Sequence, residues 1–330
     1  MNPVKIISAS AGTGKTTRLA RIISEHVANE TARPEAVVAT TFTKRAAAEL
    51  AERARAKLLE AGEPEKAQRL QAARIGTVNG VCGALVQDFA FDQGLSPSVT
   101  VLDKDQADLE LKRVGGQAMP ADLLAEIGLL EERFGRNSWD WHAAAVEIVM
   151  FARTNGISGD RFSEMADASV ASVLSLFSSE TADAAKLDLA LTQALALYPA
   201  AIDLGVDKTK TTATALRDIE AAKKKGVEKL TWSEWASLAS SSFSKKSEVA
   251  AEPLVDAASA HHRHPRLKDD VRRATHAVFR SAQAMLDAYQ AHKQRLGVID
   301  FIDQETYALE LLRKPEIRER LASEIDLVLV

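Results

Sequence analysis

The residues best suited to chemistry lie near the start of the chain and match a phosphate-binding loop. They are Ala9, Ser10, Ala11, Gly12, Thr13, Gly14, Lys15 and Thr16, which fit the P-loop pattern with alanine in place of the first glycine. Gly12 and Gly14 allow the backbone to curl so that its N–H groups point at phosphate oxygens. Lys15 would reach the β- and γ-phosphates, and the Thr16 hydroxyl would bind Mg²⁺. The pattern predicts a nucleoside triphosphate site, for ATP with Mg²⁺; the plainer alternative is a glycine-rich turn before an amphipathic helix.

A second polar run, Thr41–Leu50, combines hydroxyl groups with two cations at the expected start of a helix. Backbone N–H groups are unpaired at a helix N-terminus, so Thr41, Thr43 and Lys44 could bind the phosphates of a nucleic acid. Phe42 beside them could stack on a base. The alternative is a threonine N-cap on a solvated helix, with Phe42 in the core.

Alternating strands and helices must position these two runs. The apolar segments 4–9 and 36–42 predict short buried strands, and 74–78 could form a third. Helices are predicted over 15–29, 44–60 and 79–92, with Gly62 and Pro64 interrupting the chain after the second of them. This order predicts a parallel α/β sheet.

The alternation of predicted strands and helices ends near residue 103 and returns near the end of the sequence. Residues 103–295 are almost entirely helical in pattern, without a convincing strand. Loops are expected at Gly115-Gly116, Gly135, Asn155-Gly156 and His264-Pro265. After Gly297, residues 299–312 predict a helix and 325–330 a buried strand. The arrangement predicts one nucleotide-binding domain with a helical domain inserted in it.

One part of the helical block is basic. Residues 223–273 contain eleven Lys or Arg against seven Asp or Glu, with Trp232 and Trp235 among them. Cations interleaved with aromatic rings could follow a nucleic-acid backbone. We favour the alternative, a solvated helical face with both tryptophans packed in the core or at its edge.

Composition limits the class of protein without choosing the function. A chain of 330 residues can form two domains, or one domain with a large insertion. The single cysteine excludes a disulfide within the chain and favours the reducing cytoplasm. The start lacks a signal sequence, and no run reaches the length of a membrane span. A net charge of -4 neither indicates nor excludes a nucleic-acid partner.

Two further stretches complete a set of four motifs. They are Ile75–Cys82, which reads Ile-Gly-Thr-Val-Asn-Gly-Val-Cys, and Asp300–Asp303 followed by Ala308-Leu309 and Ile325–Val330. With the P-loop and Thr41-Phe42-Thr43 they resemble the UvrD/Rep-type superfamily 1 DNA helicases. The resemblance is greatest to the RecB/AddA branch, where the loop often reads ASAGTGKT. It covers about 1–92 and 296–330, with a helical insertion where the family places one.

The resemblance implies a fold, an activity and a role for each matching residue. The fold would be a P-loop, RecA-like parallel-sheet domain (1–102 and 296–330) with an all-helical insertion (103–295), helix-rich overall. The activity would be ATP-dependent movement along single-stranded DNA, with the insertion touching duplex DNA at the junction. A possible partner would be a nuclease or helicase subunit. Ala9–Thr16 would hold ATP. The residues lying along the single strand would be Thr41, Phe42, Thr43, Lys44, Thr77 and Asn79.

Three departures from the family pattern limit these expectations. Asn79 stands where the family has histidine, and only eight residues precede the P-loop. The sequence reaches Val330 one residue before the place where the family has Asp-Glu-x-x-Asp, the carboxylates that bind Mg²⁺ and position water. We therefore expect the N-terminal portion of a longer helicase or helicase–nuclease, without appreciable ATPase activity of its own. Asp300 is expected to be a helix N-cap.

Two other classes of protein remain as alternatives. A truncated P-loop module could act through nucleotide or DNA binding alone, without catalysis. A P-loop kinase or another small NTPase is a third class, but the Thr41–Leu50 motif and the long helical insertion argue against it.

Overall fold

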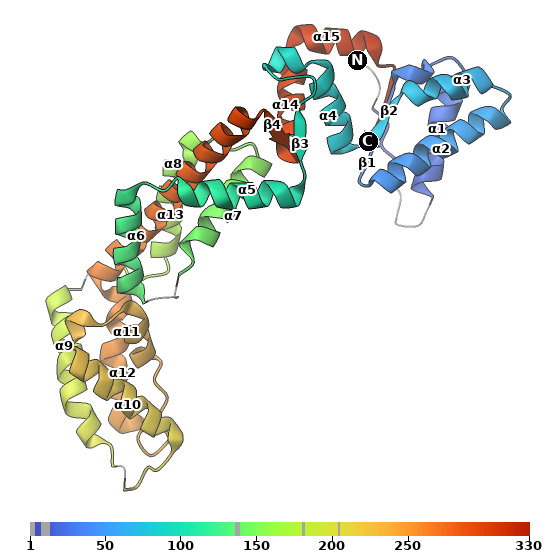
Figure 1. The fold of residues 1–330 in the computed structure, drawn as a ribbon. Coiled ribbons are helices and arrows are strands. Elements are labelled where there is room, and N and C mark those ends of the chain that lie inside the picture. The colour runs from blue at the N-terminus through green and yellow to red at the C-terminus, as the bar shows by residue number, and fades with distance from the viewer. Residues whose placement is uncertain (1–3, 8–13, 136–138, 180–181, 204) are drawn as a thin grey trace. The chain divides into compact units, whose positions relative to one another are not determined.

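The computed structural model describes residues 4–7, 14–135, 139–179, 182–203 and 205–330. The described chain is rich in helices and contains two small parallel sheets (Figure 1). It divides into two compact units, Met1–Asp108 with Lys293–Val330 and, between them in the chain, Leu109–His292.

The first unit contains a three-stranded parallel sheet. Its strands are β1 (Val37–Thr41), β2 (Arg74–Thr77) and β5 (Leu327–Leu329), in the order β2-β1-β5. The predicted strands at 36–42 and 74–78 are confirmed. The strand predicted at 325–330 is shorter and only half-buried, with Val328 exposed. Side chains on opposite faces of a strand alternate, so burial of one face of β5 leaves Val328 in solvent.

Two helices bury one apolar stripe each against this sheet. They are α1 (Lys15–Ala28) and α2 (Lys44–Glu60), which match the predicted helices closely. Gly62 has a φ of 79°, a conformation that glycine adopts without strain, and α3 (Pro64–Arg69) begins just beyond it. The shared core consists of Ala20, Ile23, Val27, Val37, Ala39, Leu50, Ala54 and Leu58. The three- and four-residue spacing of these side chains explains why both segments form amphipathic helices.

A second pair of parallel strands was not foreseen in the sequence. Strands β3 (Thr100–Leu102) and β4 (Val298–Asp300) pair along their three residues. The helix predicted at 299–312 therefore begins two residues later, as α14 (Phe301–Arg313). Around it lie α4 (Val78–Asp88) and α15 (Pro315–Glu324), whose apolar side chains form a second core with α14. Strands of three residues are too short for an alternating pattern to reveal them.

The strand predicted at 4–9 is wrong for the residues that the structure describes. Residues 4–7 have no strand conformation, and Val4 and Ile6 are exposed. An apolar run becomes a strand only when a sheet edge accepts its backbone hydrogen bonds and a neighbouring layer covers its side chains. Residues 4–7 pair with none of the described strands.

The described part of the second unit contains helices and connecting segments but no strand, as its sequence predicted. Its helices are α5 (Lys104–Gln117, starting in the first unit), α6 (Ala121–Phe134), α7 (Trp141–Thr154), α8 (Phe162–Leu174), α9 (Ala184–Leu197), α10 (Lys210–Lys225), α11 (Trp232–Ala239), α12 (Glu248–Ser259) and α13 (Pro265–Leu296). The loop predicted at Gly115-Gly116 is wrong, because both residues lie inside α5. A Cβ atom at Gly115 would come within 2.7 Å of Cγ of Met285, so glycine here permits close packing on α13.

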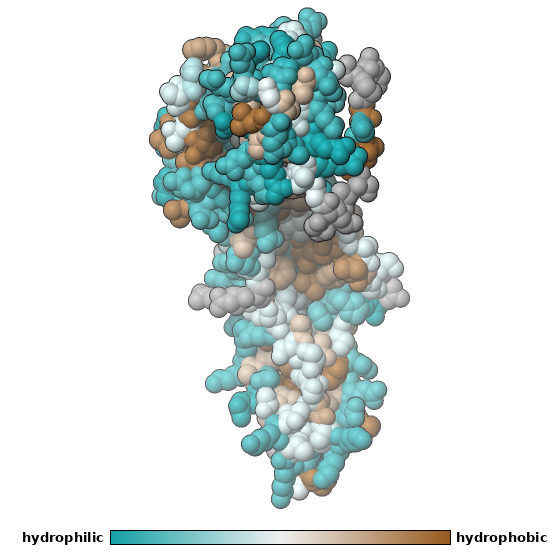
Figure 2. Space-filling view, turned by 90° about the vertical axis from the view of Figure 1, so that its right-hand side faces the viewer, coloured by the Kyte–Doolittle hydropathy of each residue, from teal (hydrophilic) through white to brown (hydrophobic). Residues whose placement is uncertain are grey.

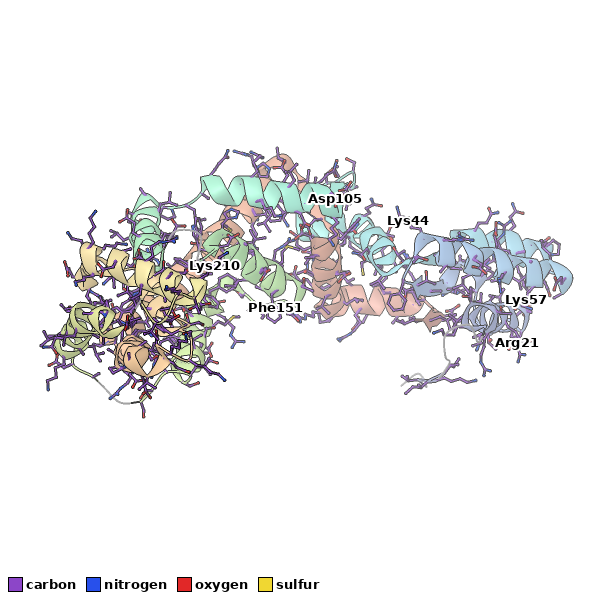
Figure 3. The ribbon with its side chains drawn as sticks, turned by 90° about the horizontal axis from the view of Figure 1, so that it is seen from below. Arg21, Lys44, Lys57, Asp105, Phe151 and Lys210 are labelled. Atoms are coloured by element: carbon purple, nitrogen blue, oxygen red, sulfur yellow. The ribbon has the colours of Figure 1, made fainter. Side chains whose placement is uncertain are left out.

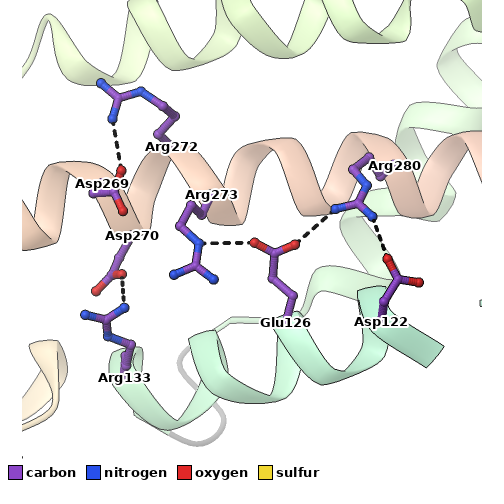
Figure 4. Close-up of polar contacts among 8 residues, drawn as sticks. All are labelled: Asp122, Glu126, Arg133, Asp269, Asp270, Arg272, Arg273 and Arg280. Atoms are coloured by element: carbon purple, nitrogen blue, oxygen red, sulfur yellow. Dashed lines mark hydrogen bonds and ion pairs between the residues drawn. The ribbon is translucent and has the colours of Figure 1, made fainter. Parts of the chain in front are cut away.

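Charged side chains join α6 to α13 within the second unit (Figure 4). Glu126 accepts from Arg273 at 3.1 Å and from Arg280 at 3.0 Å. Arg133 forms an ion pair of 2.7 Å with the buried Asp270. These contacts fix the two helices side by side, and they occupy several of the cations and carboxylates of this region.

Candidate nucleotide and nucleic-acid site

The start of α1 is the described part of the predicted nucleotide site. Ala9, Ser10, Ala11, Gly12 and Thr13 lie outside the described residues. Gly14 is the N-cap of α1 with a φ of 80°, and a Cβ atom placed there would meet nothing within 4 Å. The first turn of α1 contains no acidic residue. Lys15 is exposed and Thr16 is half-buried. A helix N-terminus with a cation and a hydroxyl in its first turn fits an anionic ligand, so these residues suit a triphosphate with Mg²⁺.

The start of α2 combines a satisfied cap with exposed ligand-binding groups. The Thr43 hydroxyl accepts from the backbone N–H of Ala46 at 3.1 Å, and the Thr41 hydroxyl donates to the Thr43 carbonyl at 3.0 Å. The N-cap interpretation of Thr43 is confirmed. The alternative that places Phe42 in the core is wrong, because this side chain is 100% exposed. Lys44 is also exposed at the first position of the helix (Figure 3).

The start of α4 also has a threonine N-cap, but a hydrogen bond to another helix holds it in addition. The Thr77 hydroxyl accepts from the backbone N–H of Gly80 at 3.1 Å. The Asn79 amide donates to the carbonyl of Phe301 at 3.1 Å. Both side chains are half-buried. Asn79 thus uses one of its amide hydrogens within the chain and keeps further hydrogen-bonding capacity for a ligand.

The sheet brings these two helix starts together. Strands β1 and β2 are parallel, and Thr41 stands opposite Thr77 in their register. Their carboxyl ends therefore lie at one edge of the sheet, where ligands of open parallel sheets bind. Thr41–Lys44 and Thr77–Asn79, which lie more than thirty residues apart in sequence, become neighbours.

Arg53 links α2 to the start of α1, a role that was not predicted from the sequence. Its guanidinium donates to the Thr17 hydroxyl and forms an ion pair of 2.5 Å with Glu49. Glu49 and Arg53 are four residues apart in one helix, which was a visible signal for the ion pair. The contact to Thr17 depends on how the helices pack, so the sequence alone did not show it.

Strand β5 pairs with β1 on the side opposite β2, and hydrogen bonds between Arg33 and Asp326 hold it there. Arg33 donates to Asp326 from Nε at 2.8 Å, from Nη2 at 3.0 Å and from its backbone N–H at 2.8 Å. Arg33 also donates to the carbonyl of Ser323. Hydrogen bonds from Arg33 lower the pKa of the Asp326 carboxyl. The backbone N–H of Asp326 donates to the carbonyl of Ala36, which sets the pairing of β5 with β1.

The start of α14 confirms one expectation and adds another residue. Asp300 is the N-cap of α14, as predicted, and forms a reciprocal capping box with Asp303. Lys293 contacts both carboxylates, with Nζ 3.3 Å from Oδ2 of Asp300. The Asp-x-x-Asp spacing was a visible signal for the capping box, but only the cap at Asp300 was predicted. Nothing in the sequence indicated Lys293 as its partner.

The tryptophans of the basic segment lie in the core of the second unit. Trp232 and Trp235 are buried and stacked, with ring centroids 5.6 Å apart. Nε1 of Trp232 donates to Oδ2 of Asp270 at 2.8 Å. Several neighbouring cations bind other parts of the chain, including Lys225 with Glu234 at 2.6 Å. The core interpretation of both rings is confirmed.

The surface over α1 to α3 is mostly hydrophilic on the side shown in Figure 2. Arg21 and Lys57 extend into solvent from α1 and α2 in Figure 3. No helix in the described part of the chain has both the length and the apolar character needed to cross a membrane.

The protein is rich in helices and contains a small parallel sheet, and its candidate ligand-binding groups lie where strands lead into helices. A family model for the UvrD/REP helicase N-terminal domain matches residues 2–330, so the chain belongs to this family.

Its relatives are helicase proteins of the AddA and RecB type, as the sequence motifs indicated. The AddA-type ATP-dependent helicase/nuclease subunit of Lactobacillus helveticus is 31% identical over 128 residues, which cover 36% of this chain and 10% of that protein. The protein of the same description from Pelotomaculum thermopropionicum is 36% identical over 115 residues, covering 32% and 9%. The RecBCD enzyme subunit RecB of Mycobacterium tuberculosis is 27% identical over 172 residues, covering 44% and 15%.

Proposed function

We propose that this chain is the ATP-binding lobe of an ATP-dependent DNA helicase that moves along single-stranded DNA. Residues 1–102 and 296–330 form the P-loop, RecA-like domain in this proposal, and 103–295 form its helical insertion. Membership of the UvrD/REP helicase family supports the class of activity. The relatives of the AddA helicase/nuclease type and RecB support a partner helicase or nuclease subunit. The proposal also includes a substrate with a junction between single-stranded and duplex DNA.

The observation that carries the proposal is the meeting of two helix starts at one sheet edge. Thr41–Lys44 and Thr77–Asn79 follow neighbouring parallel strands and present hydroxyl, amide and ammonium groups there. Phosphate contacts from such groups position a nucleic acid without reading its sequence. The exposed ring of Phe42 adds a surface on which a base can stack. Single-stranded DNA offers both phosphates and unpaired bases.

The nucleotide site in this proposal is Ala9–Thr16, and ATP with Mg²⁺ supplies the free energy of phosphoryl transfer when bound. Lys15 would neutralise charge on the terminal phosphates, and Thr16 would hold Mg²⁺ through its hydroxyl. The N-terminus of α1, with no acidic residue in its first turn, favours the negative charge of the phosphates. Arg53 contacts Thr17 in the same helical turn, which joins this site to α2 and its DNA-contacting start.

The test measures binding of a fluorescent oligo(dT) by this chain as a function of salt, with Lys44→Gln and Lys57→Gln. Both lysines belong to α2, but Lys57 lies at its far end. Loss of one phosphate contact should reduce the slope of log K against log[salt] by about 0.7 in Lys44→Gln. Lys57→Gln should keep the slope of the unaltered chain. Equal slopes for all three proteins, or no binding of oligo(dT), would contradict the proposed DNA site.

Nucleotide binding is tested on the unaltered chain and on two further variants, with a fluorescent ATP analogue and Mg²⁺. Lys15→Ala should abolish binding, and Arg21→Ala, which alters an exposed ion pair of the same helix, should preserve it. We expect this chain to show no appreciable ATP hydrolysis. A helicase that contains this lobe should hydrolyse ATP faster when DNA is present. If it bound nucleotide and DNA without such turnover, the result would instead support a non-catalytic nucleotide- and DNA-binding module.

A further inference from the structure

The start of α14 contains a buried cluster of three charged side chains. The exposed fractions of the Lys293, Asp300 and Asp303 side chains are 6%, 3% and 15%. Lys293 lies near the end of α13 and bridges the two carboxylates. Removing one partner of a buried ion pair is costly, because it leaves an uncompensated charge in a poorly solvated place. The cluster therefore holds the end of α13 and the start of α14 in one arrangement.

This cluster is more than a helix cap requires. Oδ1 of Asp300 accepts from the backbone N–H groups of Ile302 and Asp303, and Oδ2 of Asp303 accepts from the N–H of Asp300. An exposed serine or threonine followed by glutamate can make such a box without a buried cation. The additional contact of Lys293 fixes the orientation of the turn that carries Phe301.

That turn in turn holds the start of α4. The Phe301 carbonyl accepts from the Asn79 amide at 3.1 Å. One helical turn further along α4, a Cβ atom on Gly83 would lie 2.3 Å from Nε2 of Gln304, so the two helices approach closely there. The place of Thr77 and Asn79 is therefore set by α14 as well as by β2.

We propose that Lys293, with Asp300 and Asp303, is a positioning group that holds the Thr77–Asn79 segment in the geometry that binds single-stranded DNA. The inference rests on the proposed function, because it assigns the cluster a role at that DNA site. Lys293 acts through the backbone of Phe301 and the amide of Asn79, and does not itself touch DNA.

The test uses the 330-residue chain with Lys293→Met, and with Lys104→Met as a matched control on an exposed lysine of the same unit. Hydrogen exchange of amides at the start of α4 and at the start of α2 is measured first. Lys293→Met should speed exchange at the α4 start about tenfold or more and leave the α2 start unchanged. Lys104→Met should change neither helix start.

Affinity for oligo(dT) is measured on the same variants. Lys293→Met should raise Kd about two- to tenfold, the range expected when one neutral hydrogen bond at the site is lost. Asn79→Ala should raise Kd by a similar factor, and the double variant should be no weaker than either single variant, because both changes break one chain of contacts. Additive losses would show that Lys293 acts elsewhere and would overturn the proposal.

A general folding defect in Lys293→Met could also speed exchange and raise Kd, so it must be distinguished from the proposed effect. If Lys293→Met does not fold, Lys293→Met with Asp303→Asn carries the test, because that pair of changes keeps the net charge of the cluster. A variant that unfolds at lower temperature but keeps the exchange of α4 and the Kd of the unaltered chain would overturn the positioning role. If the unaltered chain does not bind oligo(dT), the proposed function fails, and hydrogen exchange alone decides the link between Lys293 and α4.

Discussion

Helices α2 and α4 both begin with a threonine cap at the end of a parallel strand, but their surroundings differ. Thr43 and Thr77 each accept one backbone N–H of the following helix, at 3.1 Å in both cases. Phe42 and Lys44 at the start of α2 are exposed to solvent. At the start of α4, Asn79 instead donates to another helix.

The difference separates two tasks that a binding site must perform. Exposed groups on a well-capped helix can exchange water for a ligand without disturbing the fold. A half-buried segment held by a second helix keeps its geometry while a ligand binds and leaves. We therefore expect the α2 start to contribute most of the free energy of ligand binding. The α4 start would hold its own ligand-binding groups in a constant position.

The largest effect that this comparison predicts is on DNA affinity in Phe42→Ala. Stacking of a base on an aromatic ring contributes about 1–3 kcal/mol, so Kd for oligo(dT) should rise about 5- to 150-fold. Stability should stay within about 0.5 kcal/mol of the unaltered chain, because an exposed side chain away from structural contacts contributes little to folding. Fluorescence anisotropy and urea unfolding measure the two quantities.

Phe91→Ala is the matched control for this prediction. Phe91 is also highly exposed, but it lies in the 3₁₀ helix Ala90–Gln93, beyond α4. Its replacement should change neither Kd nor stability. A loss of affinity in Phe91→Ala equal to that in Phe42→Ala would mean that any exposed ring binds DNA, and the α2 start would lose its special role.

The next effect concerns the two caps, compared through Thr43→Ala and Thr77→Ala. Loss of a threonine N-cap costs about 0.5–2 kcal/mol, so urea unfolding should show a similar loss for both variants. Local hydrogen exchange should differ. The first turn of α2 should lose protection in Thr43→Ala, whereas that of α4 should keep most of its protection in Thr77→Ala, because the Asn79–Phe301 bond remains.

Thr77→Ala combined with Asn79→Ala is the decisive variant for that comparison. It removes the cap and the tether together, so the α4 start should now lose protection as the α2 start does in Thr43→Ala. Loss of protection at α4 in Thr77→Ala alone would show that the tether contributes nothing and that the two helix starts are held alike.

The parts of the fold that the sequence predicted depend on local signals. The apolar run of β1, the threonine cap of α2 and the three- and four-residue spacing in α1 and α2 are properties of adjacent residues. The features that were missed depend on partners far along the chain. Gly115 was predicted as a loop because nothing nearby shows that Met285 packs against it. Among the described strands, β3 and β4 pair only with each other, and three residues carry too little pattern to predict a strand.

In the candidate site, too, local signals were predicted and contacts between distant residues were missed. A cap was predicted at Asp300 and, as one of two alternatives, at Thr43, and both caps are present. The cap at Thr77 was not predicted. Whether Phe42 is buried or exposed could not be decided from its neighbours, because an aromatic residue between strand and helix suits either. Arg53 and Lys293 were missed, because their roles arise only when α1 meets α2 and α13 meets α14.

A smaller effect is expected from adding one methyl group to α4 with Gly83→Ala. Alanine favours a helix over glycine by about 1 kcal/mol, but here the new Cβ would lie 2.3 Å from Nε2 of the buried Gln304. We expect displacement of Gln304 to outweigh that gain, so urea unfolding should show a net loss of about 1 kcal/mol. Exchange at the α4 start should rise, because α4 is moved away from α14.

Gly128→Ala in α6 is the matched control, because a Cβ atom there meets nothing within 4 Å. It should stabilise the chain by about 0.5–1 kcal/mol. If Gly83→Ala stabilised the chain equally, α4 and α14 would not be closely packed, and the difference between the two helix starts would lose its physical basis.

The smallest effect is expected on the far side of β1, where Arg33 holds Asp326. Hydrogen bonds from Arg33 lower the pKa of Asp326 in the folded chain. Because the folded value lies below the unfolded one, which is about 4, the pair stabilises the fold above that pH. This stabilisation is lost as the pH falls through the folded pKa. The effect should be small, since the side chains are 51% and 28% exposed and water screens the pair.

Urea unfolding at about pH 6 and about pH 3 measures this effect in the unaltered chain and in Asp326→Asn. The variant should be less stable at the higher pH and should lose less on acidification, whereas Asp105→Asn, at an exposed carboxylate in α5, should behave as the unaltered chain does. An equal loss in Asp326→Asn would show that other carboxylates cause the acid response.

Hydrogen exchange in Asp326→Asn then tests the comparison between the α2 and α4 starts. If the α4 start is held by α14, loosening β5 should leave its protection unchanged, whereas a rise in exchange at α4 on loss of the Asp326 contact would mean that the sheet, and not the Phe301 tether, fixes that helix start.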